Sequence, residues 1–157
     1  MNTHYLFAYG TLKSDQPEHA AHCSKPISIT KARAPGTLWR LREGYPILQI
    51  DPKTSLLSAT SSPEADWQEA IQLSKGSTPL TSCEHWIEGE LFEYPLTSNV
   101  LDKMDQWENV SPGTNSPYRR HIIWVQDETE QARAAWAYVC YSPPNWATML
   151  QEQSWHS

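Results

Sequence analysis

The amino-terminal stretch YLFAYGTL, residues 5–12, decides how the chain begins its sheet. Aromatic and aliphatic side chains at residues 5–9 predict a buried strand, which Gly10-Thr11 ends abruptly. Consecutive backbone N–H groups in a tight turn point into one concavity, and glycine allows a close approach to the backbone. We expect this turn either to bind a carboxylate or an oxyanion, or simply to reverse the chain.

Two hairpins are predicted beyond this first strand. The stretches APGTLWRL (34–41) and YPILQI (45–50) are separated by a short connection in which Gly44 suits positive φ. The stretches at 118–125 and 132–141 have the same strand character and a similarly short connection. Their Trp and Tyr side chains are expected in the core and on the sheet face.

Periodicity predicts one more strand and a short helix. WIEGELFEY (86–94) alternates apolar and acidic residues, as a half-buried strand does. Residues 98–107 place apolar side chains at helical spacing, with Thr97 or Ser98 available as the N-cap. Clustered strands with few helices between them predict an α+β domain on a strongly curved mixed or antiparallel sheet.

A single domain over residues 1–157 is expected, because this length can bury one core and is short for two ordinary domains. The Ser-, Thr- and Pro-rich stretch at about 51–85 is interpreted as an insertion with one predicted helix, 63–75. Ser142-Pro143-Pro144 is expected to close the sheet, and the tail after residue 150 to be loose.

The composition argues against several classes of function. Twelve Lys and Arg stand against eighteen Asp and Glu, a formal net charge of −6 at pH 7, so nucleic acid is not expected as a partner. No apolar run approaches the roughly 20 residues that span a bilayer, and the start lacks a signal-like pattern. We therefore expect a cytoplasmic protein without a membrane partner. Three widely spread cysteines fit reduced thiols better than disulfides.

Glu108 is the main candidate for catalysis. It follows the predicted helix, beside Trp107 and before a turn-rich loop. A carboxylate at a helix C-terminus lies against the helix dipole, which disfavours its ionised form and raises its pKa. A raised pKa suits a base, whereas the simpler alternative is a solvated residue at a helix end. Asp102 and Asp105 on the same helix are expected to be exposed or to cap it.

Two weaker candidates involve histidine and cysteine. His19, His22 and Cys23 form HAAHC, and together with Cys83 and His85 they allow a zinc site, although structural zinc usually takes tighter, repeated spacings. Cys23 as a nucleophile beside either histidine has no evident third group to orient it. Unrelated loop and surface positions are the simpler interpretation.

Six short motifs, taken in order, carry a family resemblance. They are FAYGTL (7–12), GYP (44–46), GELF (89–92), LDKMDQWEN (101–109), YRR (118–120) and AWAYV (135–139). In this order they resemble the gamma-glutamylcyclotransferase-like (AIG2-like) family over nearly the whole chain, apart from residues 51–85 and the tail. The resemblance implies a small curved β-barrel with a few short helices, in which the turn of Tyr9, Gly10, Thr11 and Leu12 lies at the mouth of a cavity.

The resemblance also implies a reaction. A gamma-glutamyl amine or peptide would cyclise by attack of its own α-amine on the γ-carbonyl, releasing 5-oxoproline and an amine, transferase or lyase chemistry of the kind found in glutathione metabolism. Glu108 matches the family's catalytic acid/base, the four turn residues would bind substrate, and Tyr118 would line the pocket. No cofactor or metal is required. Asn109 replaces a glycine of many members, which leaves the choice of substrate open.

Two other functions remain open on the same fold. One is a small-molecule binding protein without turnover, and the other is an interaction module in which residues 51–85 dock a protein partner. We expect a monomer or weak homodimer whose partner is a small gamma-glutamyl substrate. Residues 51–85 are expected to build the pocket wall against the leaving amine, and the turn and Glu108 are expected to face one cavity.

Overall fold

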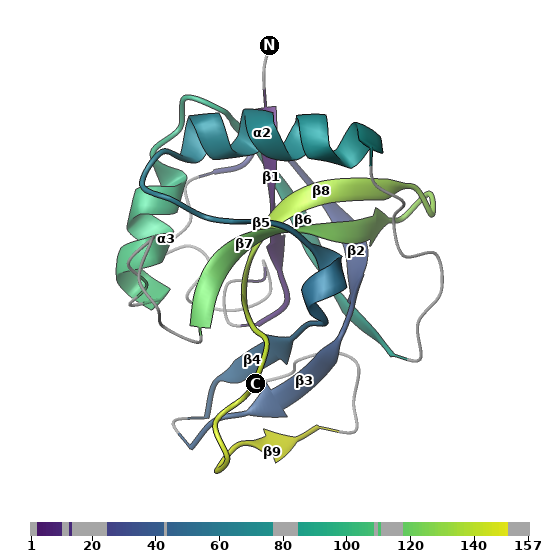
Figure 1. The fold of residues 1–157 in the computed structure, drawn as a ribbon, viewed down its shortest axis with the longest axis vertical. Coiled ribbons are helices and arrows are strands. Elements are labelled where there is room, and N and C mark those ends of the chain that lie inside the picture. The colour runs from purple at the N-terminus through teal and green to yellow at the C-terminus, as the bar shows by residue number, and fades with distance from the viewer. Residues whose placement is uncertain are drawn as a thin grey trace.

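A computed structural model describes residues 3–10, 13, 25–42, 44–76, 85–108, 110 and 118–150. Their centre is a closed five-stranded barrel with helices outside it (Figure 1). The barrel strands are β1 (Thr3–Ala8), β2 (Ser28–Pro35), β6 (Trp86–Pro95), β7 (Tyr118–Asp127) and β8 (Ala132–Cys140). The predicted α+β class with a small, strongly curved mixed barrel is confirmed.

The barrel closes through one parallel and four antiparallel pairings. β1 lies between β6, to which it is antiparallel, and β8, to which it is parallel with Leu6 opposite Trp136. β2 pairs with β6 along its whole length and with β7 at Ala32 and Arg33, while the β7–β8 hairpin completes the ring. Because the barrel closes, each of these five strands has a hydrogen-bonded neighbouring strand on both sides.

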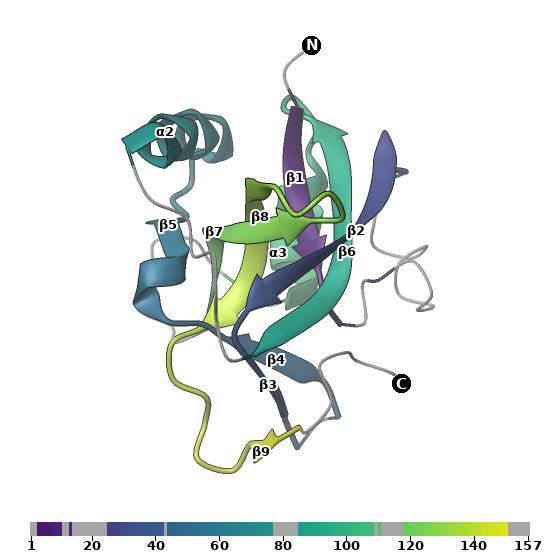
Figure 2. The ribbon, with the colours of Figure 1, turned by 90° about the vertical axis from the view of Figure 1, so that its right-hand side faces the viewer.

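A small sheet extension lies below the barrel in Figures 1 and 2. β3 (Thr37–Arg40) and β4 (Pro46–Gln49) form the expected hairpin, and Gly44 in its connection has a φ of 90°. β9 (Thr148–Met149) pairs with β3, so the chain returns to the sheet after the prolines. The expectation that Ser142-Pro143-Pro144 closes the sheet was therefore wrong.

β2 carries a weak sequence signal. Its buried positions include Ala32 and Ala34, whereas Ile29 is 43% exposed, so the strand lacks the apolar alternation on which sequence patterns depend. Small side chains suit the narrow interior of a five-stranded barrel. The predicted strand at 34–41 is divided at Gly36 between β2 and β3.

Residues 51–76 pack onto the barrel. After a 3₁₀ turn (Pro52–Thr54), β5 (Ser55–Ser58) pairs with β7, and α2 (Pro63–Gly76) matches the predicted helix. In Figure 2, α2 and β5 lie on one side of the barrel and β6 on the other. Trp67 of α2 is buried, with its ring centroid 5.9 Å from that of Trp136 in β8. This segment thus contributes to the core.

The second helix, α3 (Val100–Glu108), follows the predicted amphipathic pattern. Val100 N–H donates to the Ser98 side chain at 3.2 Å, which satisfies one of the first amides of the helix. Val100, Leu101 and Met104 are buried against the barrel. Neither α2 nor α3, the α-helices of the described residues, is long and apolar enough to cross a membrane.

A buried ion pair joins α3 to the barrel. Arg120 of β7 donates from Nε and Nη2 to the two carboxylate oxygens of Asp105, at 2.9 and 3.1 Å. The Tyr138 hydroxyl of β8 donates to the same carboxylate at 2.6 Å. Arg120 is 1% exposed and Asp105 8% exposed, so the expectation of an exposed or capping Asp105 was wrong. Helical spacing does place Asp105 next to Met104 on the buried side, where only a paired carboxylate is tolerated.

Asp105→Asn should destabilise the protein by about 3–5 kcal/mol, because it leaves the buried Arg120 charge without its counter-ion. Urea unfolding followed by circular dichroism measures this free energy. Asp102→Asn, an exposed change on the same helix, is the matched control and should cost less than about 1 kcal/mol. Equal stability of the two variants would contradict a central role for the ion pair.

Candidate active site

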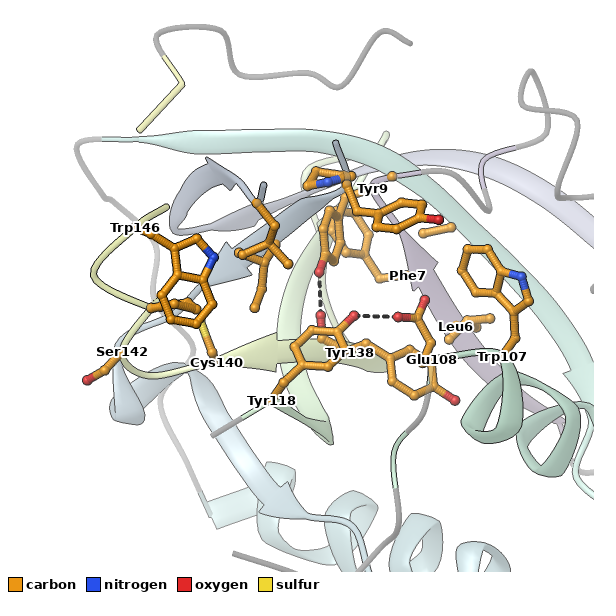
Figure 3. A pocket seen from close by; sticks show the side chains of 17 residues that line it. Leu6, Phe7, Tyr9, Trp107, Glu108, Tyr118, Tyr138, Cys140, Ser142 and Trp146 are labelled. Carbon is orange, nitrogen blue, oxygen red and sulfur yellow. Dashed lines mark hydrogen bonds between the residues drawn. The ribbon is translucent and has the colours of Figure 1, made fainter. Parts of the chain in front are cut away.

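A cavity of about 550 Å³ opens where β1 ends (Figure 3). Its wall contains Tyr9 and Gly10 from the end of β1 and Glu108 from the end of α3, almost a hundred residues later in the chain. The expectation that the turn and Glu108 face one cavity is confirmed for Tyr9 and Gly10. Thr11 and Leu12 lie outside the described residues, so their part in binding stays a prediction.

Glu108 is the last residue of α3 and its half-buried side chain points into the cavity (Figure 3). The Tyr118 hydroxyl donates to its Oε2 at 2.7 Å. Burial raises the pKa of Glu108 to about 7, and the Asp105 charge adds to this effect, while the bond from Tyr118 opposes it. The predicted direction is confirmed, but the main cause is burial and not the end of the helix.

The helix is fixed where Glu108 leaves it. Val110 N–H donates to the Asp105 carbonyl at 2.9 Å, a six-to-one bond that satisfies one of the last carbonyls of α3. Asp105, which lies three residues before Glu108, is itself held by Arg120. The carboxylate of Glu108 is therefore positioned by groups that belong to the core.

Two tyrosines line the cavity beside Glu108. Burial is the largest cause that raises the pKa of both the Tyr9 and the Tyr118 hydroxyl, so both remain protonated donors at neutral pH. Tyr9 donates to the Tyr138 carbonyl at 2.5 Å and accepts from Leu48 N–H at 3.1 Å. Tyr9 thus ties β1 to β8 and β4, while Tyr118 holds the Glu108 carboxylate.

Gly10 is required by packing. A methyl group at this position would lie 2.7 Å from Cγ of Pro46, so the end of β1 and the start of β4 can meet only at a glycine. The Lys13 N–H donates to the Gly10 carbonyl at 3.1 Å and closes the turn. The close approach seen in the structure is therefore to Pro46, and the expected anion site stays a prediction.

Several lining residues carried no functional prediction. Tyr138 and Cys140 come from β8, where sequence patterns indicated core positions only. The β3–β4 hairpin and the segment after β8 complete the lining with Leu41, Tyr45, Pro46, Ile47, Ser142, Pro144 and Trp146. Of these, Ser142 and Trp146 lie on the side of the cavity opposite Glu108, here called the far wall (Figure 3). The GYP motif was the one sequence signal for the hairpin residues.

The wall expected from residues 51–85 is not seen. None of the described residues of that segment lines the cavity, because they pack over β7 and β8 instead. The expectation was wrong for this part of the chain. Contact with the barrel through Trp67 explains the difference, since burial of an indole strongly favours the core over the cavity mouth.

The histidine and cysteine candidates fall mostly outside the described residues. His19, His22, Cys23 and Cys83 lie outside the described residues, and within the described part no three metal-binding side chains cluster. Burial raises the pKa of the Cys140 thiol to about 11, so this cavity residue is a thiol at neutral pH and a poor nucleophile.

The sequence matches the family described as gamma-glutamyl cyclotransferase, AIG2-like, over residues 6–57 and 60–157. The chain belongs to this family. Membership supports a cyclotransferase-like function. The match includes most of residues 51–85, so that segment is part of the family's sequence pattern.

Solved structures share the fold of this AIG2-like protein. An AIG2-like protein from Mus musculus has a TM-score of 0.61 and 18% identity, with 99% of this chain and 90% of that chain covered. YkqA from Bacillus subtilis has a TM-score of 0.58 and 18% identity, with 98% of this chain and 40% of that chain covered. A protein from Arabidopsis thaliana, solved in solution, has a TM-score of 0.55 and 18% identity, covering 97% and 77%. At this identity the likeness concerns the fold alone. No curated protein matches the sequence.

Tyr118→Phe should raise the pKa of Glu108 above its value of about 7, because the lost hydrogen bond stabilises the ionised carboxylate. A carbon-detected NMR titration of the glutamate carboxyl groups measures this shift. Tyr45→Phe removes a hydroxyl from the same cavity without removing a described bond to Glu108, and should leave the pKa in place. A lowered pKa in Tyr118→Phe would contradict the assigned bond.

Proposed function

We propose that this AIG2-like protein cyclises gamma-glutamyl amines or peptides to 5-oxoproline, with Glu108 as the general acid/base. The observation that carries the proposal is a cavity carboxylate whose pKa of about 7 lets it both accept and return a proton at neutral pH. Family membership and the position of Tyr9 and Gly10 at the same cavity support it.

The first step moves a proton from the substrate to the protein. Glu108 in its ionised form takes one proton from the substrate α-ammonium, which leaves a neutral amine with a free electron pair. That amine attacks the γ-carbonyl carbon, a C–N bond forms, and the carbonyl electrons move onto oxygen. Donors at the turn would stabilise this oxyanion, each by on the order of 3 kcal/mol when well placed.

The second step breaks the original amide. Protonated Glu108 gives its proton to the leaving nitrogen, the oxyanion electrons re-form the C=O bond, and the C–N bond breaks with its electron pair going to the amine. Glu108 then takes the second proton from the ring nitrogen, leaving the lactam of 5-oxoproline, and passes that proton to the released amine. Both protons lost by the α-nitrogen end on the leaving group, so the reaction needs no co-reactant.

This reaction explains why one carboxylate is enough. The nucleophile is part of the substrate, and holding the glutamyl group folded supplies much of the roughly 7–11 kcal/mol available from proximity. Tyr118 would orient Glu108 and, as a protonated phenol, would not compete for the proton. Tyr9, Gly10, Thr11, Leu12 and Tyr118 are the proposed substrate-binding residues.

The direct test is release of 5-oxoproline from a panel of gamma-glutamyl amines and peptides incubated with the purified protein. Turnover of any member supports the proposal. Binding of the panel without 5-oxoproline release would instead assign the cavity to a small-molecule binding protein.

Glu108→Gln should lower kcat about 10²–10⁴-fold and leave the fold intact, because the amide accepts the Tyr118 hydrogen bond but cannot accept a proton from the α-ammonium. Measurement of 5-oxoproline release with one good substrate tests this. Asp102→Asn, an exposed carboxylate on the same helix, is the matched control and should retain activity. Wild-type kcat in Glu108→Gln would remove Glu108 from the mechanism.

The pH dependence has a defined sign. The base must be ionised in the free enzyme, so kcat/KM should rise tenfold per pH unit below about 7 and level off above it. In Tyr118→Phe the break should move to higher pH, because that variant loses the bond that stabilises ionised Glu108. Initial rates at low substrate concentration across pH 5 to 9, roughly two units either side of the break, measure the profile. A profile that stays flat down to pH 5, as expected for a glutamate with the ordinary pKa of about 4.3, would contradict the role of burial.

A further inference from the structure

The cavity has two chemically different ends. Figure 3 shows Glu108 and Trp107 on one side, Trp146 and Ser142 on the opposite side, and Tyr118 between them. Its volume of about 550 Å³ lies within the roughly 300–1,000 Å³ of pockets that hold drug-sized ligands. A gamma-glutamyl group at the Glu108 end therefore leaves room for a sizeable leaving group at the other.

We propose that the leaving group is an uncharged, apolar and preferably aromatic amine substituent that lies against Trp146. This inference rests on the proposed function and names the substrate class of the same site. The leaving nitrogen must come within reach of Glu108, so the rest of the amine extends away from Glu108 toward Trp146.

The described cavity lining offers little to a charged substituent. The residues from the β3–β4 hairpin and the segment after β8 include aliphatic Leu41, Ile47 and Pro144 and aromatic Tyr45 and Trp146. Among the described lining residues, Glu108 is the one ionisable side chain that carries charge at neutral pH, and it lies at the opposite end from Trp146. The Arg42 guanidinium lies near the Trp146 ring but is exposed and outside the lining, so a charged substituent would lose hydration without gaining a counter-ion inside the cavity.

Two aromatic lining residues are exposed in the free protein. Tyr45 is 49% exposed and Trp146 45% exposed, although both are large apolar side chains. A ligand ring that covers Trp146 removes apolar surface from water on both partners and allows offset or edge-to-face stacking. Such contacts favour an aromatic substituent over a short aliphatic one.

The position of Trp146 is built into the fold. Ala147 N–H donates to the Pro144 carbonyl at 3.0 Å, and Leu150 N–H donates to the Leu38 carbonyl at 2.9 Å. β9 then pairs with β3, and the Arg42 guanidinium lies 5.2 Å from the Trp146 ring centroid. Trp146 is thereby held against the β3–β4 hairpin before ligand arrives, which reduces the ordering cost of binding.

Three substrates test the inference. They are the methylamide and the phenethylamide of the glutamate γ-carboxyl, and gamma-glutamylphenylalanine, which adds a carboxylate to the phenethylamide. We expect kcat/KM for the phenethylamide to exceed that for the methylamide by about tenfold or more. We also expect the phenylalanine compound to be no better than the phenethylamide. A phenylalanine compound preferred by about tenfold, or a methylamide equal to the phenethylamide, would overturn the inference.

Variants assign the preference to the far wall. Trp146→Ala should bring the phenethylamide-to-methylamide ratio close to one. Met149→Ala, an exposed change in the same segment outside the cavity wall, should retain the ratio of the unmodified protein. A ratio that survives in Trp146→Ala would place the leaving group elsewhere and overturn the inference.

Calorimetric binding separates this inference from the proposed function. Glu108→Gln is expected to bind substrate without turning it over, so its affinities for the methylamide and the phenethylamide would compare contacts with the far wall directly. About tenfold tighter binding of the phenethylamide supports the inference even if the unmodified protein releases no 5-oxoproline. Equal affinities overturn the inference, while turnover of the methylamide still supports the proposed function.

Discussion

The bidentate contact between Arg120 and Asp105 is the interaction on which the arrangement of the site depends. It links β7 to α3 in the buried interior, and the Tyr138 hydroxyl of β8 completes it. Because Glu108 follows Asp105 by about one helical turn, fixing Asp105 also fixes the residue that reaches the cavity. Three elements from distant parts of the sequence, α3, β7 and β8, thus meet at the Asp105 carboxylate.

The same arrangement sets the electrostatics of Glu108. Withdrawal from water disfavours its ionised form, the neighbouring Asp105 charge acts in the same direction, and the Tyr118 hydroxyl acts against both. The result is a pKa near neutrality, which neither a fully solvated nor a fully paired carboxylate would have. The core ion pair and the proposed base are therefore coupled through Asp105. Asp105 anchors α3 to the barrel, and its charge also helps to raise the pKa of Glu108.

The cavity is divided between the barrel and the segments attached to it. Tyr9, Tyr118 and Tyr138 come from the ends and faces of barrel strands, whereas Tyr45 and Trp146 come from the β3–β4 hairpin and the segment after β8. Pairing within the barrel constrains Tyr118 and Tyr138, and the hydroxyl of Tyr9 is held by hydrogen bonds to Tyr138 and Leu48. The attached segments lie outside the closed barrel, so this part of the cavity can change with less effect on the barrel.

The elements with a clear hydrophobic periodicity could be predicted from the sequence by itself. They are most of the barrel strands, the β3–β4 hairpin with its Gly44 turn, and both helices, with Glu108 at the end of α3. The tertiary structure alone decided that Ala32 and Ala34 belong to a barrel strand, that β9 returns to β3, and that Asp105 is buried. It also decided that Trp146, and not residues of the 51–76 segment, forms the far wall. The physical reason is that periodicity reports which face of one element is apolar, whereas burial of a carboxylate or an alanine strand depends on partners far along the chain. Arg120 and Asp105 can pair only in the folded barrel, which brings β7 and α3 together.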